Sequence, residues 1–101
     1  MARLVIDDQA LADADRLLDH LVRSGVADAG ERIAAVLDSL GVLRTNPQIG
    51  RPKGSGHREL VIGKRSRGYL ALYRYDELDD LVLVLVLRSQ SELGYAGPTR
   101  G

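Results

Sequence analysis

The spacing of apolar residues changes along the chain from a helical period to an alternating one. A short apolar run at residues 3–6, with the sequence RLVI, predicts a strand. Between residues 7 and 24, apolar side chains recur every three or four positions, at Leu11, Ala14, Leu18 and Leu21 or Val22. This is the period of an amphipathic helix, and Asp7 or Asp8 is placed to cap its first turn. We therefore predict a strand followed by a helix.

A second amphipathic helix is predicted after the Ser-Gly break at residues 24–25. Asp28, followed three residues later by Glu31, resembles a capping box. The apolar positions that follow again step by three or four residues, at Ile33, Val36 or Leu37, and Leu40. The Asn-Pro pair at residues 46–47 ends the helix, because proline disfavours the helical conformation in the residue before it. Two helices in tandem predict a helical hairpin.

The remainder of the chain has the alternation of a sheet. Residues 50–57 have the composition of a loop, and three strands are predicted at residues 58–62, 68–75 and 81–87. The last run, LVLVLVL, is apolar on both faces and would aggregate at an exposed edge, so we expect it to be central. The sequence DELDD supplies the turn before it. The order β-α-α-β-β-β predicts an α+β fold in which a helical hairpin packs on a mainly antiparallel sheet.

Composition restricts the size of the fold and the chemistry available to it. A chain of 101 residues, 45% hydrophobic and 28% charged, fits one small domain over residues 1–101 with a loose tail at about residues 96–101. Without cysteine there is no thiolate metal site, and His20 and His57 are too few for the usual zinc site. The sequence GKRSRG lacks the spacing of a P-loop, and no apolar run is long enough to cross a bilayer. We expect a cytoplasmic protein that needs no cofactor or metal.

Positive charge is concentrated in one part of a chain whose formal net charge is zero. Residues 51–75 contain seven Lys or Arg and one acid, a net charge of +6, whereas residues 1–50 and 76–101 each carry −3. Such a segment either binds an acidic macromolecule or is a solvated sheet edge whose cations discourage strand pairing. For Arg74, which lies within a predicted strand, the alternative to binding is a structural role. The candidate binding residues are Arg51, Arg58, Lys64, Arg65, Arg67 and Arg88.

The order of these elements, together with four short sequences, resembles a known family. The hairpin ending in NPQIGRP, followed by HRELVI, GYLALYRY and VLRSQSELGY, resembles the RelE/ParE superfamily of bacterial toxin-antitoxin systems, and its ParE branch most. The resemblance covers nearly the whole chain. It implies a small toxin that is neutralised by a cognate antitoxin. ParE-like members act on DNA gyrase, whereas RelE-like members cut messenger RNA on the ribosome.

Those two activities require different residues. Cleavage of RNA through its own 2′-hydroxyl needs a general base, a general acid and a cation for the charge on phosphorus. RelE-like nucleases resemble one another in an arginine on the penultimate strand, where this chain has Leu70, whereas Arg88 and Tyr95 match two further positions. If the chain were a nuclease, its catalytic residues would be Arg58, Arg88 and Tyr95. Because leucine cannot stabilise a phosphorane, we expect no catalytic site and a ParE-like activity.

Other residues with suitable chemistry have simpler structural interpretations. His57 lies in a Gly-Ser loop and His20 on a helix, where a solvated position is the commoner one. Glu59, next to Arg58, favours a cross-strand ion pair over a catalytic base. The alternating tyrosines of residues 69–75 form either a stacking platform for bases or part of a core that has no Phe or Trp, with core packing favoured. The ribosome-dependent nuclease therefore stays the alternative function.

Overall fold

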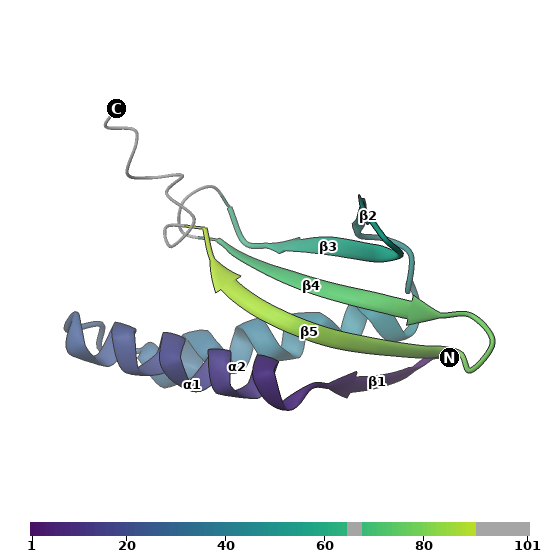
Figure 1. Ribbon diagram of the computed structural model, residues 1–101. Helices are drawn as coiled ribbons and strands as arrows, with labels where there is room; N and C mark the ends of the chain where they lie inside the picture. The colour runs from purple at the N-terminus through teal and green to yellow at the C-terminus, as the bar shows by residue number, and fades with distance from the viewer. Residues whose placement is uncertain (65–67, 91–101) are drawn as a thin grey trace.

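Two helices pack against a five-stranded sheet in the computed structural model, which describes residues 1–64 and 68–90 (Figure 1). This arrangement confirms the predicted α+β class and the helical hairpin. The elements in chain order are β1 (Arg3–Ile6), α1 (Asp8–Arg23), α2 (Ala29–Ser39), the 3-10 helix η1 (Leu40–Arg44), β2 (Arg51–Gly54), β3 (His57–Ile62), β4 (Tyr69–Asp76) and β5 (Leu81–Ser89).

Helix α1 begins and ends at the signals seen in the sequence. The carboxylate of Asp7 accepts a hydrogen bond of 3.0 Å from the backbone N–H of Gln9, which satisfies one of the unpaired amides of the first turn. At the other end, Gly25 has a φ of +80°, a left-handed conformation that glycine adopts without steric cost. The two signals confirm the predicted cap and the predicted break.

Helix α2 differs from the prediction at both ends. The side chain of Asp28 makes no capping hydrogen bond and lies 3.3 Å from the guanidinium of Arg32, so the predicted capping box is wrong. The α-helix ends at Ser39, well before Pro47, and continues as the 3-10 helix η1. Residues three apart eclipse in a 3-10 helix. Leu40 and Leu43 therefore lie on the same side of η1, and both are completely buried.

The sheet has the order β1-β5-β4-β3-β2. Strand β1 pairs in parallel with β5, and the other pairs are antiparallel. The apolar run of β5 therefore has a neighbour on each side, as predicted. The predicted loop at residues 50–57 is wrong in part, because β2 lies within it and pairs with β3. Proline is tolerated at Pro52 because β2 is an edge strand.

The core lies between the helices and the sheet, and Tyr73 is its largest fully buried side chain. The hydroxyl of Tyr73 accepts a hydrogen bond of 2.8 Å from the backbone N–H of Gly50. A Cβ at Gly50 would lie 2.7 Å from the ring of Tyr73, so the close approach of the chain to the ring requires glycine. Tyr69 and Tyr75 pack against the same cluster. Core packing, the favoured interpretation of the tyrosines, is confirmed.

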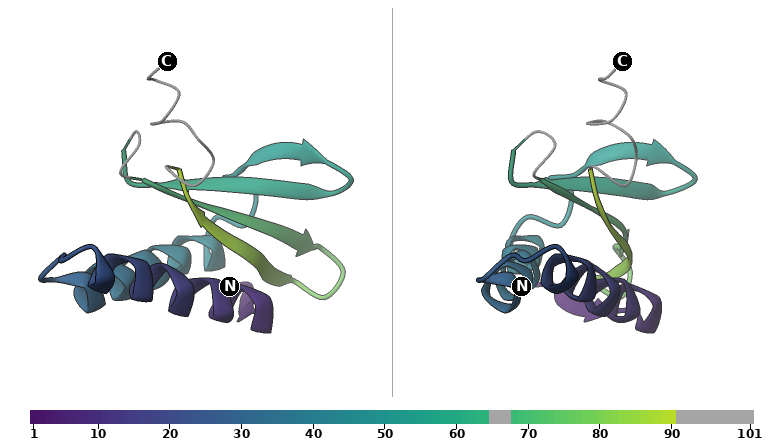
Figure 2. Two further views of the ribbon diagram at one scale, coloured as in Figure 1. Left: turned by 60° about the vertical axis from the view of Figure 1, so that its left-hand side comes forward. Right: turned by 90° about the vertical axis from the view of Figure 1, so that its left-hand side faces the viewer.

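Both helices lie on the same side of the sheet (Figure 2). Core residues such as Val82 and Val84 on β5 and Ala71 on β4 face them. Within the described ranges, no helix is long and apolar enough to span a membrane.

Candidate interaction surface

One predicted cation is held in an ion pair on the surface of the sheet. The guanidinium of Arg51 on β2 lies 2.8 Å from the carboxylate of Glu59, its cross-strand neighbour on β3. This pair confirms the structural interpretation of Glu59 over a catalytic one. The side chain of Arg51 is still 70% exposed, so its outer edge faces solvent.

Arg58 is half-buried and used by the fold. Its guanidinium donates hydrogen bonds to the backbone carbonyls of Gln48, at 3.0 Å, and Gly50, at 2.8 Å. These carbonyls belong to the segment that leads into β2, where they have no strand to pair with. Arg58 therefore fastens this segment to β3, and its contribution to binding stays a prediction.

A third cation of the basic segment, Lys64, follows the end of β3. Lys64 is exposed and lines a groove of about 500 Å³ between α2 and the sheet, together with Arg32, Ile62 and Tyr69. Arg65 and Arg67 lie outside the described residues, as does Tyr95. The structure thus places Lys64 on the surface, where a partner can reach it.

Arg88 on β5 lies directly opposite Leu70 on β4. Directly opposite residues of an antiparallel pair share a face of the sheet. The position beside Arg88 is therefore filled by a leucine that is only 7% exposed, not by a second cation. This is the position at which the nuclease resemblance fails in the sequence.

The nuclease candidates Arg58 and Arg88 are not brought together. Arg58 is opposite Tyr73, whose side chain faces the core, whereas Arg88 is opposite Leu70, three residues along β4. An odd number of residues along a strand reverses the face, and three residues span about 10 Å. The two guanidinium groups therefore belong to opposite faces of the sheet. His57 on β3 is opposite Arg74, one residue farther along β4 from Leu70 than Tyr73 is.

A cleft of about 600 Å³ separates α1 from the edge of β5 and is lined by Gln9, Asp13, Arg16, Val86 and Arg88. It arises because β1 pairs with β5 only as far as Val84. A bulge follows, since Leu72 pairs with Val86 but Tyr73 with Val84, which leaves Leu85 as an extra residue. Beyond the bulge, α1 takes the place of β1 beside the strand.

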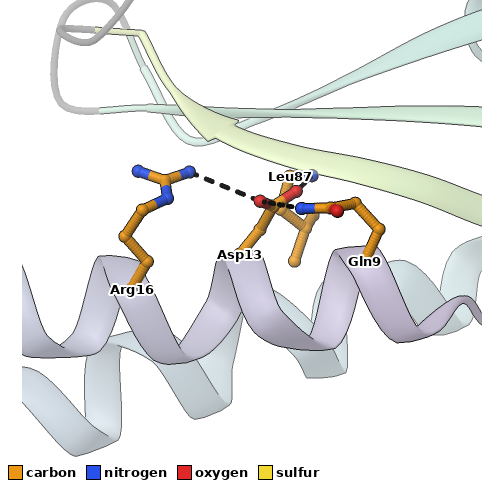
Figure 3. Close-up of polar contacts among 4 residues, drawn as sticks. All are labelled: Gln9, Asp13, Arg16 and Leu87. Atoms are coloured by element: carbon orange, nitrogen blue, oxygen red, sulfur yellow. Dashed lines mark hydrogen bonds and ion pairs between the residues drawn. The ribbon is translucent and has the colours of Figure 1, made fainter.

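The carboxylate of Asp13 bridges the two walls of this cleft (Figure 3). One oxygen accepts a hydrogen bond of 2.9 Å from the backbone N–H of Leu87 on β5, and the other accepts one of 3.0 Å from the side-chain amide of Gln9. The guanidinium of Arg16 lies 3.6 Å away. Asp13 is buried and engaged on both oxygens, so the carboxylate that lines the cleft with Arg88 is not free to act as a base.

The role of Asp13 was missed in the sequence, although a signal was present. Asp13 lies three residues after Ala10 and four before Leu17, on the buried side of α1. An acid at such a position needs a hydrogen-bond donor from the element that the helix covers. The sequence did not show that the donor would be a strand amide.

The hydroxyl of Tyr75, at the other end of the sheet, also has a hydrogen-bond partner within the fold. The hydroxyl of Tyr75 donates a hydrogen bond of 2.7 Å to the carboxylate of Asp80 in the turn between β4 and β5. This bond raises the pKa of Tyr75 above its ordinary value of 10.0, and desolvation and the charge of Asp80 act in the same direction. The hydroxyl of Tyr75 therefore serves the turn between β4 and β5. No group of His, Asp and Glu side chains in residues 1–64 and 68–90 is arranged to hold a metal ion.

Comparison with known proteins identifies a family whose model matches most of the chain. Residues 4–94 match the family model described as the ParE toxin of the type II toxin-antitoxin system parDE. No curated protein sequence matches the chain.

Solved structures share the fold. A chain of the chromosomal ParDE TA system from P. aeruginosa is 24% identical, covering 88% of this chain and 96% of that chain, with a TM-score of 0.73. A chain of the intact E. coli RelBE toxin-antitoxin complex is 17% identical, with the same coverage and a TM-score of 0.64. The isolated E. coli RelE toxin is 18% identical over 99% of this chain and 98% of that chain, also with a TM-score of 0.64.

Proposed function

The chain belongs to the family of ParE toxins of type II toxin-antitoxin systems, and we propose that it inhibits DNA gyrase by binding and is neutralised by a cognate antitoxin. The observation that carries the gyrase assignment is the pairing of Leu70 with Arg88. A phosphoryl-transfer site needs cations aimed at the charge that builds on phosphorus, together with an acid and a base. Here the cation has an apolar neighbour, and the carboxylate in its cleft is fully engaged.

Binding requires only an accessible and complementary surface, which the cations can supply. We assign target binding to Lys64, Arg65, Arg67 and Arg88, with Arg51 and Arg58 contributing through the parts of their guanidinium groups that the fold leaves accessible. Exposed cations around an apolar surface attract acidic proteins and DNA at long range. The proposal places the toxin in the cytoplasm, as one domain over residues 1–101.

Purified toxin incubated with gyrase, ATP and plasmid DNA tests the proposal. Wild type should inhibit supercoiling or trap cleaved DNA in a gyrase-dependent way. A Lys64→Ala, Arg65→Ala, Arg67→Ala variant should lose most of this effect, whereas its thermal stability should change little because exposed charge deletions cost less than about 0.5 kcal/mol each. Arg23→Ala is the matched control, since Arg23 is exposed on α1 and paired with Asp19. It should inhibit gyrase as well as wild type.

A parallel reaction with translating ribosomes examines the alternative. We expect no cleavage of messenger RNA by wild type. Ribosome-dependent cleavage that disappears in Arg88→Ala or Tyr95→Phe, together with unimpaired gyrase, would reject gyrase inhibition and assign the nuclease activity instead.

A further inference from the structure

The face of the sheet turned away from both helices is apolar at its centre. We call it the open sheet face and define it by Val5 on β1, Leu81 and Leu83 on β5, Leu72 on β4 and Val61 on β3. Side chains alternate between the two faces along a strand. These five residues alternate with the core residues that face the helices, and Figure 2 shows both helices on that other side.

The five apolar side chains that define the open sheet face are accessible, whereas Leu70, opposite Val61 and Arg88 on the same face, is buried. Val5 and Val61 are 44% and 43% exposed, and Leu72, Leu81 and Leu83 are half-buried. Val5 lies opposite Leu83, and a hollow of about 560 Å³ is lined in part by Leu81 and Leu83. An apolar area that spans several strands of a small protein marks an interaction surface.

Three arginines share the open sheet face with this apolar belt. Arg3 is opposite Leu81, and Arg74 is opposite Leu83 and lines the same hollow. Arg88 lies at the margin of the face, beside the α1 cleft. All three are exposed, and none forms an ion pair with another residue of the described ranges.

The acids on the same face are already engaged. Glu59 is paired with Arg51, and Asp76 accepts hydrogen bonds from the backbone N–H groups of Leu78, at 3.0 Å, and Asp79, at 3.2 Å. Asp76 keeps its charge, and Asp76 and Glu77 line the same hollow as Arg74. The open sheet face still has a net positive charge, because the arginines Arg3, Arg51, Arg74 and Arg88 outnumber the acids Glu59, Asp76 and Glu77. Such a surface is complementary to a segment that is both acidic and amphipathic.

We propose that the open sheet face is the docking surface of the antitoxin, which lays an acidic amphipathic segment across β5, β4 and β3. Apolar side chains of that segment cover Leu72 and Leu83, and its carboxylates pair with Arg3 and Arg74. The inference rests on the proposed function, since it takes the antitoxin as the partner. It adds Arg3, which lies outside the basic segment, and assigns a binding role to Arg74.

Charge argues against two other occupants of the open sheet face, a second copy of the chain and the chain's own residues 91–101. A second copy of the chain, related by a two-fold axis, would place the arginines of one open sheet face against those of the other, and like charges brought together at an interface oppose association. Residues 91–101 of the chain itself contain one acid and one arginine, so they carry no excess of negative charge. An acidic partner supplies what both of these occupants lack.

Affinity for the antitoxin encoded beside the toxin tests the proposal in the absence of gyrase. Arg74→Glu and Arg3→Glu should each weaken binding about tenfold, and the double variant about a hundredfold. The salt dependence of the affinity should shrink in the double variant, because fewer ion pairs remain to be screened. Arg23→Glu, the same charge reversal on α1, is the control and should bind as wild type does. Thermal unfolding of each variant verifies the fold, and Arg74→Gln, with a smaller loss, avoids the introduced charge.

Three results would overturn the docking surface. The double variant could bind the antitoxin as tightly as wild type, Arg23→Glu could weaken binding equally, or the free toxin could form a dimer that Arg74→Glu disrupts. A wild-type toxin that binds antitoxin but leaves gyrase unaffected would reject gyrase as the target without changing these readings.

Discussion

Removal of the Asp13 carboxylate should destabilise the protein because two hydrogen-bond donors from different elements depend on it. In wild type, the backbone N–H of Leu87 and the side-chain amide of Gln9 both donate to this carboxylate. Strand β1 ends its pairing at Val84, so no neighbouring strand can replace Asp13 as the acceptor for Leu87. Asp13→Ala therefore leaves a strand amide unpaired beneath α1.

The expected loss follows from the environment of that amide. A buried donor without an acceptor costs about 1–3 kcal/mol, and hydrogen bonds to a charged acceptor are at the upper end of that range. We expect Asp13→Ala to lower the free energy of unfolding by about 2 kcal/mol. For a domain of this size, such a loss lowers Tm by about 10 °C. Asp13→Asn retains an oxygen for Leu87 but loses the charge that Arg16 meets, and should cost about 1 kcal/mol.

Urea and thermal unfolding of wild type, Asp13→Ala, Asp13→Asn and one control variant measure the contribution of the Asp13 carboxylate. The matched control is Asp15→Ala, because Asp15 is exposed on the same helix and its replacement changes helix propensity by the same amount. The order of stability should be wild type and Asp15→Ala, then Asp13→Asn, then Asp13→Ala. Equal stability of the two alanine variants would refute the reasoning and show that the bond to Leu87 contributes nothing net.

Two further predictions concern the core and the turn between β4 and β5. Gly50→Ala should lower the free energy of unfolding by about 1–3 kcal/mol, because its Cβ would lie 2.7 Å from the ring of Tyr73. Gly41→Ala is the control and should be neutral in the same urea titration, since nothing lies within 4 Å of a Cβ at Gly41. Equal effects of the two substitutions would contradict the clash. Since the hydrogen bond to Asp80 raises the pKa of Tyr75, the stability that this bond contributes should be complete below about pH 10 and disappear as pH rises through the raised pKa. The difference in urea midpoint between wild type and Tyr75→Phe should therefore close in alkali, and a difference independent of pH would exclude this contact.

Elements held by local signals were predictable from the sequence. Helix α1 combines a regular apolar period with a cap and a glycine stop, all within one segment. The apolar run of β5 required neighbours on both sides, which fixed its central place. Strand β2 was missed because its sequence, RPKG, has no apolar alternation. It is a strand because β3 supplies its backbone partners, and the pairing of Arg51 with Glu59 joins residues that periodicity does not connect.

Contacts of the candidate interaction surface were predictable only where the type of one residue indicated its partner. Glu59 beside arginines in an expected strand indicated an ion pair, and the structure contains it. The carbonyl bonds of Arg58 depend on the path of the chain before β2, which residue types do not encode. Arg3 was overlooked because charge was summed along the sequence, whereas a sheet gathers residues from distant segments. In the folded chain, Arg3 and Arg74 flank β5 on the same face.

This gathering gives the neutral chain two sides of opposite charge. Helix α1 contains four aspartates and two arginines, and α2 contains two acids and one arginine, so the helical layer is negative. The sheet presents Arg3, Arg74 and Arg88 on its other side, with their apolar neighbours. If the antitoxin docks as proposed, a separation of this kind orients the acidic partner before contact, because the helical layer repels it and the open sheet face attracts it. Net charge therefore says little about the partners of this toxin, because the sheet register determines which residues the partner meets.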